Sequence, residues 1–220
     1  MCIAIVKKIN GSITDDALIQ SSRCNRDGGG YAFIDADGAL QIKKGFFKVD
    51  EFLASYRAEE AIFGPTSPFL IHFRIGTSGS IDKDNCHPFE YEHGALIHNG
   101  IFYHAQGNKS DTHELVGEIG KFLSKEAVQE KLPGLKQAFS GNKVALLFKD
   151  RTFSIINEES GSWENDVWYS NSSWRSYTPR GGGSPNVHSA SGMPAPSRYL
   201  GHSRYGYEYP GHPHMLGYDG

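Results

Sequence analysis

Short apolar runs separated by turn residues recur along the first 170 residues of the chain. The run from Cys2 to Ile9 is rich in β-branched residues and stops at Asn10-Gly11, a pair typical of turns, so it predicts a strand. The segment Asp35-Ala36-Asp37-Gly38 separates two further runs and predicts a hairpin. The other predicted strands are Gly30–Ile34, Leu40–Lys43, Phe69–Phe73, Ala95–Ile97, Lys143–Phe148, Phe153–Ile156 and Val167–Ser170.

Apolar residues three or four positions apart mark the predicted helices between these strands. Thr14 before Asp15-Asp16 has the features of a helix start, and so does Ser110 before Asp111-Thr112. We expect an interruption near Pro133-Gly134, because proline lacks the N–H that a helix interior needs. The predicted helices are a short one after Thr14, Val49–Ile62, Ser110 through Phe122, and Lys125–Phe139. Two sets of strands with helices between them predict a layered α+β domain.

Composition changes sharply near residue 172. Residues 173–220 contain nine Gly and six Pro among 48 positions, and their only Val, Leu or Ile residues are Val187, Leu200 and Leu216. Such a segment buries too little apolar surface to offset the entropy lost on ordering. We therefore expect a folded domain over residues 2–172 and a disordered, low-complexity tail rich in Gly, Pro, Tyr and His over residues 173–220.

Charge and hydropathy exclude several classes of partner. The net charge of −3 gives no basic surface for nucleic acid. No apolar run approaches the roughly 20 residues that cross a bilayer, and the N-terminal apolar stretch precedes its lysines, the reverse of a secretory signal. Three cysteines without paired spacing indicate a reducing compartment, so we expect a cytoplasmic protein. Ten histidines show no recognised ligand spacing, and no metal site is predicted.

Cys2 is the first candidate for chemistry. An initiator Met is generally removed when a small residue follows it, and removal here would leave a thiol and an α-amine on one residue. A thiol has a pKa of about 8.5 and an α-amine about 7.7–8.0, so the amine can accept the thiol proton. That is a nucleophile with its own general base. Taken alone, Met1-Cys2 fits a buried cysteine of a first strand better.

Three later segments carry groups that an amide-cleaving site needs. Arg74 follows a strand and can clamp a carboxylate with two parallel hydrogen bonds. Asn99 and Gly100 offer an amide side chain beside a backbone N–H, the donors that a tetrahedral oxyanion requires. Asp111 stands at a helix start, where its carboxylate can face an ammonium group. The glycine-rich turn Arg26–Ala32 suits close backbone packing near such a site.

Read together and in order, these segments resemble the class II glutamine amidotransferases of the N-terminal-nucleophile hydrolase superfamily. The order is Cys at the start, a DGxG-like turn, HxRxxTxG, HPF, HNG and SDT, and it extends from Cys2 to about Trp174. The resemblance implies an α+β fold of the four-layer αββα sandwich type and a reaction that needs no cofactor. It also indicates a compact, stand-alone form, because the domain is short.

The resemblance assigns roles residue by residue. Ile75 and Ser78 stand where the family often has an aromatic residue and a histidine, positions that shape the glutamine pocket. The implied roles are Cys2 as nucleophile with its α-amine as base, Asn99 and the Gly100 N–H as oxyanion hole, Arg74 on the glutamine carboxylate with help from Thr77 and Ser78 backbone groups, Asp111 on the glutamine ammonium, and Arg26 and His87 in supporting positions.

The implied function is cleavage of the side-chain amide of L-glutamine through a Cys2 thioester, with delivery of ammonia to an acceptor. Synthases of this family usually carry the acceptor chemistry in a second domain, and residues 173–220 do not form one. The acceptor is therefore expected on a separate protein, or the protein is a stand-alone amidohydrolase. Two alternatives stay open: hydrolysis of a different amide, and an inactive fold that serves as a binding module through its tail. Neither the acceptor nor the oligomeric state follows from the sequence.

Overall fold

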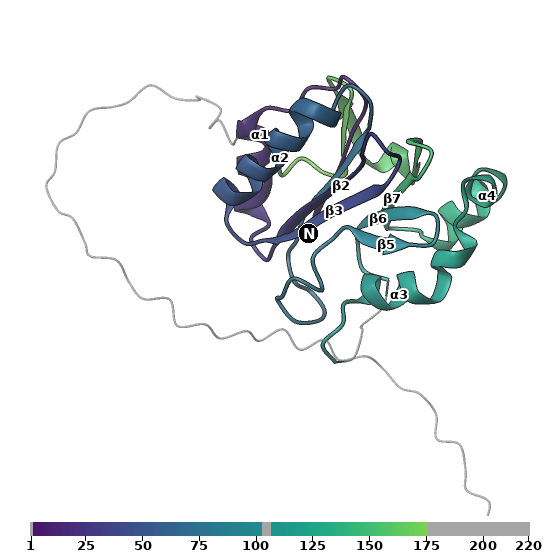
Figure 1. Cartoon of the computed structure of the whole chain (residues 1–220). Helices are drawn as coiled ribbons and strands as arrows, with labels where there is room; N and C mark the ends of the chain where they lie inside the picture. Colours follow the sequence, from purple (N-terminus) through teal and green to yellow (C-terminus); the bar gives the residue numbers. More distant parts are fainter. Residues whose placement is uncertain (1, 103–106, 176–220) are drawn as a thin grey trace, which may run out of the picture. The chain divides into compact units, whose positions relative to one another are not determined.

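A computed structural model describes residues 2–102 and 107–175 (Figure 1). The predicted tail lies outside the described residues from residue 176 onward. Within the described part the chain is mixed α and β, with four α-helices and two antiparallel sheets. No described helix is both long and apolar enough to cross a lipid bilayer.

The first sheet has six strands in the order β3-β2-β4-β1-β10-β9. The strand that follows Cys2, β1, lies near its centre and pairs with β4 on one side and β10 on the other, both antiparallel. The strands are β1 (Ile3–Lys7), β2 (Gly29–Ile34), β3 (Leu40–Phe46), β4 (Phe69–Phe73), β9 (Ser162–Glu164) and β10 (Val167–Tyr169).

The second sheet has four strands in the order β5-β6-β7-β8. They are β5 (Phe89–Tyr91), β6 (Gly94–Asn99), β7 (Lys143–Phe148) and β8 (Phe153–Ile156). The helices are α1 (Asp15–Cys24), α2 (Val49–Phe63), α3 (Asp111–Ile119) and α4 (Lys125–Ala138). In Figure 1, α1 and α2 lie together beside β2 and β3, whereas α3 and α4 lie beyond β5 to β7.

Alternation of side chains explains how both sheets become buried. On β1, Ile3 and Ile5 join a cluster with Leu18 of α1 and Phe52 of α2, whereas Ala4 and Val6 point to the opposite face. There they meet Ala95, Ile97, Ala145 and Leu147 of the second sheet. A third cluster joins the remaining face of that sheet to α3 and α4 through Val116, Val128, Leu146 and Phe148.

Most predicted elements are confirmed within one to three residues, whereas the expected interruption near Pro133 was wrong and two short strands were missed. The helix α4 continues through Pro133 without a break, because its apolar face is held by contacts of Val128, Leu132 and Leu135 with the sheet. The helix that begins at Asp111 ends at Ile119, and Phe122 lies exposed in a short 3₁₀ turn. The sequence also missed the three-residue strands β5 and β9.

Candidate active site

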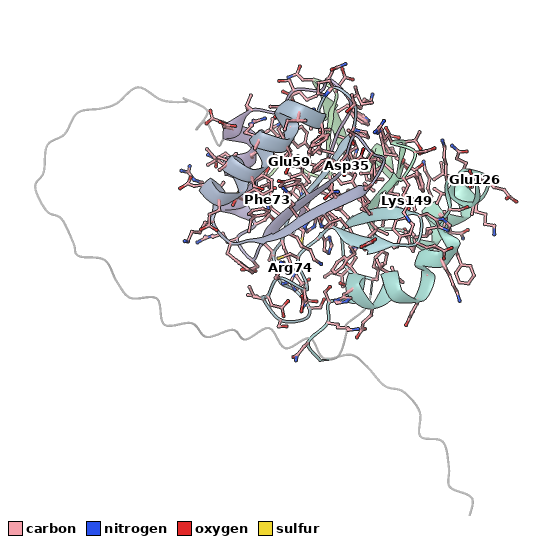
Figure 2. The ribbon with its side chains drawn as sticks, in the orientation of Figure 1. Asp35, Glu59, Phe73, Arg74, Glu126 and Lys149 are labelled. Carbon is pink, nitrogen blue, oxygen red and sulfur yellow. The ribbon has the colours of Figure 1, made fainter. Side chains whose placement is uncertain are left out.

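The strand register brings one end of three strands of the first sheet together. Ile3 at the start of β1 lies opposite Phe73 at the end of β4, and Ile5 lies opposite Tyr169 at the end of β10. Because both neighbours run antiparallel to β1, the residues that precede β1 lie beside those that follow β4 and β10. All of them lie along the edge formed by these strand ends. Cys2 and Arg74 occupy that edge, and Figure 2 labels Arg74 directly after Phe73, where the loop after β4 begins.

The thiol of Cys2 is held against the loop after β4. Its Sγ accepts a hydrogen bond from the Ile75 N–H at 3.3 Å and lies 3.4 Å from the Ile75 carbonyl oxygen. Asn171 donates a hydrogen bond to the Cys2 carbonyl at 2.7 Å, which fixes the backbone of Cys2. Burial raises the pKa of the Cys2 thiol, although the Ile75 N–H and the charge of Arg74 oppose this shift. At neutral pH the thiol is therefore protonated, so attack by its sulfur requires a base.

Asn99 ends β6 and turns its amide toward the same edge from the second sheet. Its Nδ2 donates to Ser170 Oγ at 2.8 Å, and the residue is almost completely buried. An amide nitrogen carries two hydrogens, so one remains for an oxyanion. Within the described residues its Oδ1 has no hydrogen-bond partner, even though the atom is buried.

Gly100 follows with a positive φ of 155°, which L side chains rarely adopt. A Cβ at this position would clash with Oδ1 of Asn142, which lies directly against the Gly100 backbone. The same Asn142 oxygen accepts a hydrogen bond from His98 Nε2 at 2.9 Å. Only glycine therefore fits here, because Asn142 and His98 occupy the space that a side chain would need, and Gly100 itself lines the Cys2 pocket.

Arg74 and Asp111, expected at opposite ends of an amino-acid ligand, are joined through Ser78. The Arg74 Nη2 donates to the Ser78 carbonyl at 2.6 Å and its Nη1 to the Ser80 carbonyl at 2.9 Å, which uses two of five N–H groups. The Ser78 hydroxyl donates to Asp111 Oδ1 at 3.2 Å. The Phe102 N–H donates to Asp111 Oδ2 at 2.8 Å.

Both charged groups are buried and free of ionic partners. Arg74 is 3% exposed and Asp111 6% exposed. Among the described residues neither one forms an ion pair, and their hydrogen bonds are all to neutral groups. A buried charge without a counter-ion is costly, and a ligand of opposite charge relieves that cost. The arrangement therefore favours a ligand with one carboxylate and one ammonium group.

Two pockets meet at Cys2. The first is narrow, about 20 Å³, with room for roughly one water, and its lining includes Cys2, Arg74, Thr77, Gly100 and Asp111. The second is about 330 Å³ and shares Cys2, Thr77 and Gly100 with the first. The rest of the second lining is Asn99, Ile101, Ser140, Gly141 and Asn142. A substrate bound through Arg74 and Asp111 would thus have its reacting carbon at the junction of the two.

The supporting residues expected from the sequence lie in different places. His87 lines the small pocket, and so does Ser78. Arg26 is exposed, lines neither pocket, and forms no side-chain hydrogen bond within the described part of the chain. Its neighbour Asp27, which sequence reasoning passed over, accepts a hydrogen bond from the Gly76 N–H at 2.8 Å and so holds the Arg74 loop.

Three buried histidines lie together at the pocket, two of them, His87 and His98, in its lining and the third, His72, behind them. The rings of His72 and His87 stack with centroids 4.0 Å apart, and the His98 ring lies 6.5 Å from that of His87. The backbone N–H of His98 donates to His87 Nδ1 at 3.2 Å. His72 Nε2 donates to the backbone carbonyl of His98 at 2.9 Å. Burial lowers the pKa of His72 to about 3 and that of His87 well below its usual value, and burial also lowers the pKa of His98. All three rings are neutral in the folded protein.

This cluster predicts a fall in stability at mildly acidic pH. Because the unfolded histidines take up protons near pH 6.5 while the folded His72 does not until about pH 3, the stabilisation is complete above pH 6.5 and is lost as pH falls. His72 alone should lower the free energy of unfolding by about 1.4 kcal/mol per pH unit below 6.5. Urea unfolding at pH 7, 6 and 5 measures this slope. His72→Gln should flatten it, whereas His93→Gln, in the turn between β5 and β6, should not; equal slopes in all three proteins would contradict the account.

The sequence assigned no role to several residues at the site, among them Asp27, which it showed only as the first residue of the DGxG-like turn. Asn142 and Asp27 act through backbone neighbours that are distant along the chain. Ser170 and Asn171 were visible only as the end of the last predicted strand, yet they contact Asn99 and Cys2. Among the described residues no group of three or more His, Cys, Asp or Glu side chains is arranged to hold a metal ion.

Comparison with known proteins adds no assignment to this geometry. No model of a known protein family matches the chain, and no curated protein matches it.

Proposed function

We propose that the protein is a glutamine amidohydrolase of the class II amidotransferase type, with the four-layer αββα sandwich of N-terminal-nucleophile hydrolases. The observation that carries the proposal is the meeting of Cys2, Asn99 and Gly100 beside Arg74 and Asp111, two buried charges that form no ion pair with the residues that the structure describes. The packing of α1 and α2 on one sheet, and of α3 and α4 on the other, supports the proposed fold.

In the proposed binding mode Arg74 and Asp111 bind the two charged groups of L-glutamine, and the narrow first pocket widens as the substrate enters. The free N–H groups of Arg74 bind the α-carboxylate, and the backbone at Thr77 and Ser78 completes that side of the pocket. The carboxylate of Asp111 binds the α-ammonium. The side chain of glutamine then extends toward Cys2, which places its amide carbon near Sγ.

The first half-reaction forms a thioester. The α-amine of Cys2, free once Met1 is removed, takes the thiol proton as Sγ attacks the amide carbon, and the electrons of the C=O bond move to oxygen. Asn99 Nδ2 and the Gly100 N–H donate to the oxyanion. The intermediate collapses, the carbon–nitrogen bond breaks, and the nitrogen leaves as ammonia with the proton from the α-ammonium.

The second half-reaction releases glutamate. A water molecule gives a proton to the α-amine and attacks the thioester carbon, again with the oxyanion held by Asn99 and Gly100. The carbon–sulfur bond breaks and the sulfur recovers its proton. We propose that the ammonia passes to an acceptor on a separate protein. The three free thiols of the described chain support a reducing, cytoplasmic location for this chemistry.

The direct test is release of glutamate and ammonia from L-glutamine by the purified protein, measured as equal amounts of the two products. D-Glutamine is the matched control substrate, because it cannot present its carboxylate, ammonium and amide to Arg74, Asp111 and Cys2 together. Equal rates with both enantiomers, or none with either, would contradict the proposal.

A second candidate substrate, an N-substituted γ-amide of glutamate, is favoured by the size of the second pocket. Ammonia is about the size of one water, whereas this pocket, at about 330 Å³, is far larger than the first pocket of about 20 Å³ and is lined by Cys2 but not by Arg74. An amine that carries an organic substituent would leave into that space. The recognition of the glutamyl part is the same for both substrates.

Filling the pocket should separate the two substrates. Ser140 lines the pocket, is exposed, and has no side-chain hydrogen bond within the described residues. Ser140→Trp should therefore lower kcat/KM for a γ-glutamyl anilide by at least about tenfold and leave glutamine hydrolysis within about twofold. Ser140→Ala is the control and should change neither. Equal losses with both substrates would show that the pocket does not receive the leaving amine.

A further inference from the structure

The two residues that follow β10 contact two residues of the proposed reaction: Ser170 contacts the oxyanion donor Asn99, and Asn171 contacts Cys2. Ser170, 1% exposed, follows β10, and its Oγ accepts a hydrogen bond from Asn99 Nδ2 at 2.8 Å. The same oxygen accepts the Ala4 N–H at 2.9 Å, and the Ser170 N–H donates to the Ala4 carbonyl at 2.9 Å. One hydroxyl thus joins the nucleophile strand β1 to the end of β6 in the other sheet.

We propose that Ser170 is a positioning residue, which holds the carboxamide of Asn99 in the orientation that an oxyanion needs. This proposal rests on the proposed function and assigns a residue to it. Near the site the two sheets are also joined by the hydrogen bond from His72 Nε2 to the His98 carbonyl and by apolar contacts such as those of Ala4 and Ile97, but none of these contacts the amide of Asn99 or fixes its rotation.

The geometry around Asn99 supports this role. Its Oδ1 is buried without a partner in the described chain, so the Ser170 hydroxyl is the one side-chain group that anchors the amide. Ser170 is itself held at two points by the backbone of Ala4, so its position follows that of the strand that begins at Cys2. The donor and the nucleophile are therefore placed relative to each other through one residue.

Asn171, the next residue, acts on a different group and provides a matched comparison. Its Nδ2 donates to the Cys2 carbonyl at 2.7 Å, and its Oδ1 accepts the Ser173 N–H at 3.0 Å. It therefore holds the backbone of the nucleophile and not the oxyanion donor. Substitutions at Ser170 and Asn171 should both lower the rate. The effect of the Ser170 substitution should disappear when Asn99 is already replaced, whereas the effect of the Asn171 substitution should remain.

Kinetics of single and double variants test the assignment. Ser170→Ala should lower kcat for glutamine about 10- to 100-fold with KM within about twofold, because a displaced donor loses most of its effect. Ser170→Thr, which keeps the hydroxyl, should restore most of the rate. The double variant Ser170→Ala/Asn99→Ala should be no slower than Asn99→Ala alone. In the double variant Asn171→Ala/Asn99→Ala, by contrast, the fold losses in kcat of the two single variants should multiply. Multiplying effects of Ser170 and Asn99 would overturn the proposal.

A second measurement does not depend on activity. In ¹⁵N-edited NMR spectra the side-chain amide of Asn99, identified by its loss in Asn99→Ala, should shift and exchange faster with water in Ser170→Ala. Ser21→Ala removes another fully buried hydroxyl, in α1, and should leave that signal unchanged. An unchanged Asn99 signal in a folded Ser170→Ala protein would overturn the proposal. If the wild type released no glutamate while the Asn99 signal moved as expected, the proposed function would fail and the positioning contact would stand.

Discussion

Replacing Cys2 with alanine should abolish glutamate release from glutamine while leaving the fold intact. The thiol supplies the only nucleophile of the proposed reaction, and loss of such a residue typically costs on the order of 10⁶ in kcat. Cys2 lies outside the three hydrophobic clusters, so its removal should change the melting temperature by no more than about 2 °C. A coupled glutamate assay and a thermal melt measure the two effects.

The matched control for this variant is Cys24→Ala. Cys24 is an exposed, free cysteine at the end of α1 and lines neither pocket. Its replacement should leave the rate unchanged. Residual turnover by Cys2→Ala above about one per cent of wild type would show that another group attacks the amide.

Replacing Asn99 with alanine should lower kcat by about 10²–10³ and change KM little. One oxyanion donor is worth roughly 2.7–4 kcal/mol in the transition state, and in the proposed binding mode Arg74 and Asp111 hold glutamine at its other end. Steady-state kinetics over a range of glutamine concentrations separates the two parameters.

Asn99→Asp distinguishes the donor from the shape of the side chain. Aspartate has nearly the same size, but its carboxylate donates no hydrogen bond when ionised and repels an oxyanion. It should therefore be at least as slow as Asn99→Ala, with KM again little changed. A raised KM with an unchanged kcat in either variant would place Asn99 in the binding pocket and not in the oxyanion hole.

Local patterns predicted the elements of the fold well where an element is long. The strands β1 and β4 could be predicted because their apolar runs are buried on both faces, and α3 because Ser110 caps it, with its hydroxyl accepting the His113 N–H. The strand β5 was missed because three residues give no measurable period, and its pairing with β6 is what makes it a strand. The interruption expected at Pro133 was wrong because the tertiary contacts of α4 stabilise the helix by more than one lost hydrogen bond costs.

The candidate site was predictable only in part, for a physical reason. Residue types such as Arg74 and Asp111 can be recognised in the sequence because their chemistry is specific. The groups that hold them cannot, since they act through ordinary polar contacts set by the strand register. Ser170 meets Ala4 and Asn99 only because β10 ends beside the start of β1.

The central claim is that the thiol of Cys2 works with its own α-amine. The most direct measurement compares glutamate release by two forms of the protein, identified by intact mass: one that begins at Cys2, and one in which Met1 is retained because a bulky residue inserted after it blocks processing. The account predicts that the form beginning at Cys2 turns over and that the blocked form is at least about a thousandfold slower, since an amide nitrogen cannot serve as the base. Equal rates in the two forms would contradict it.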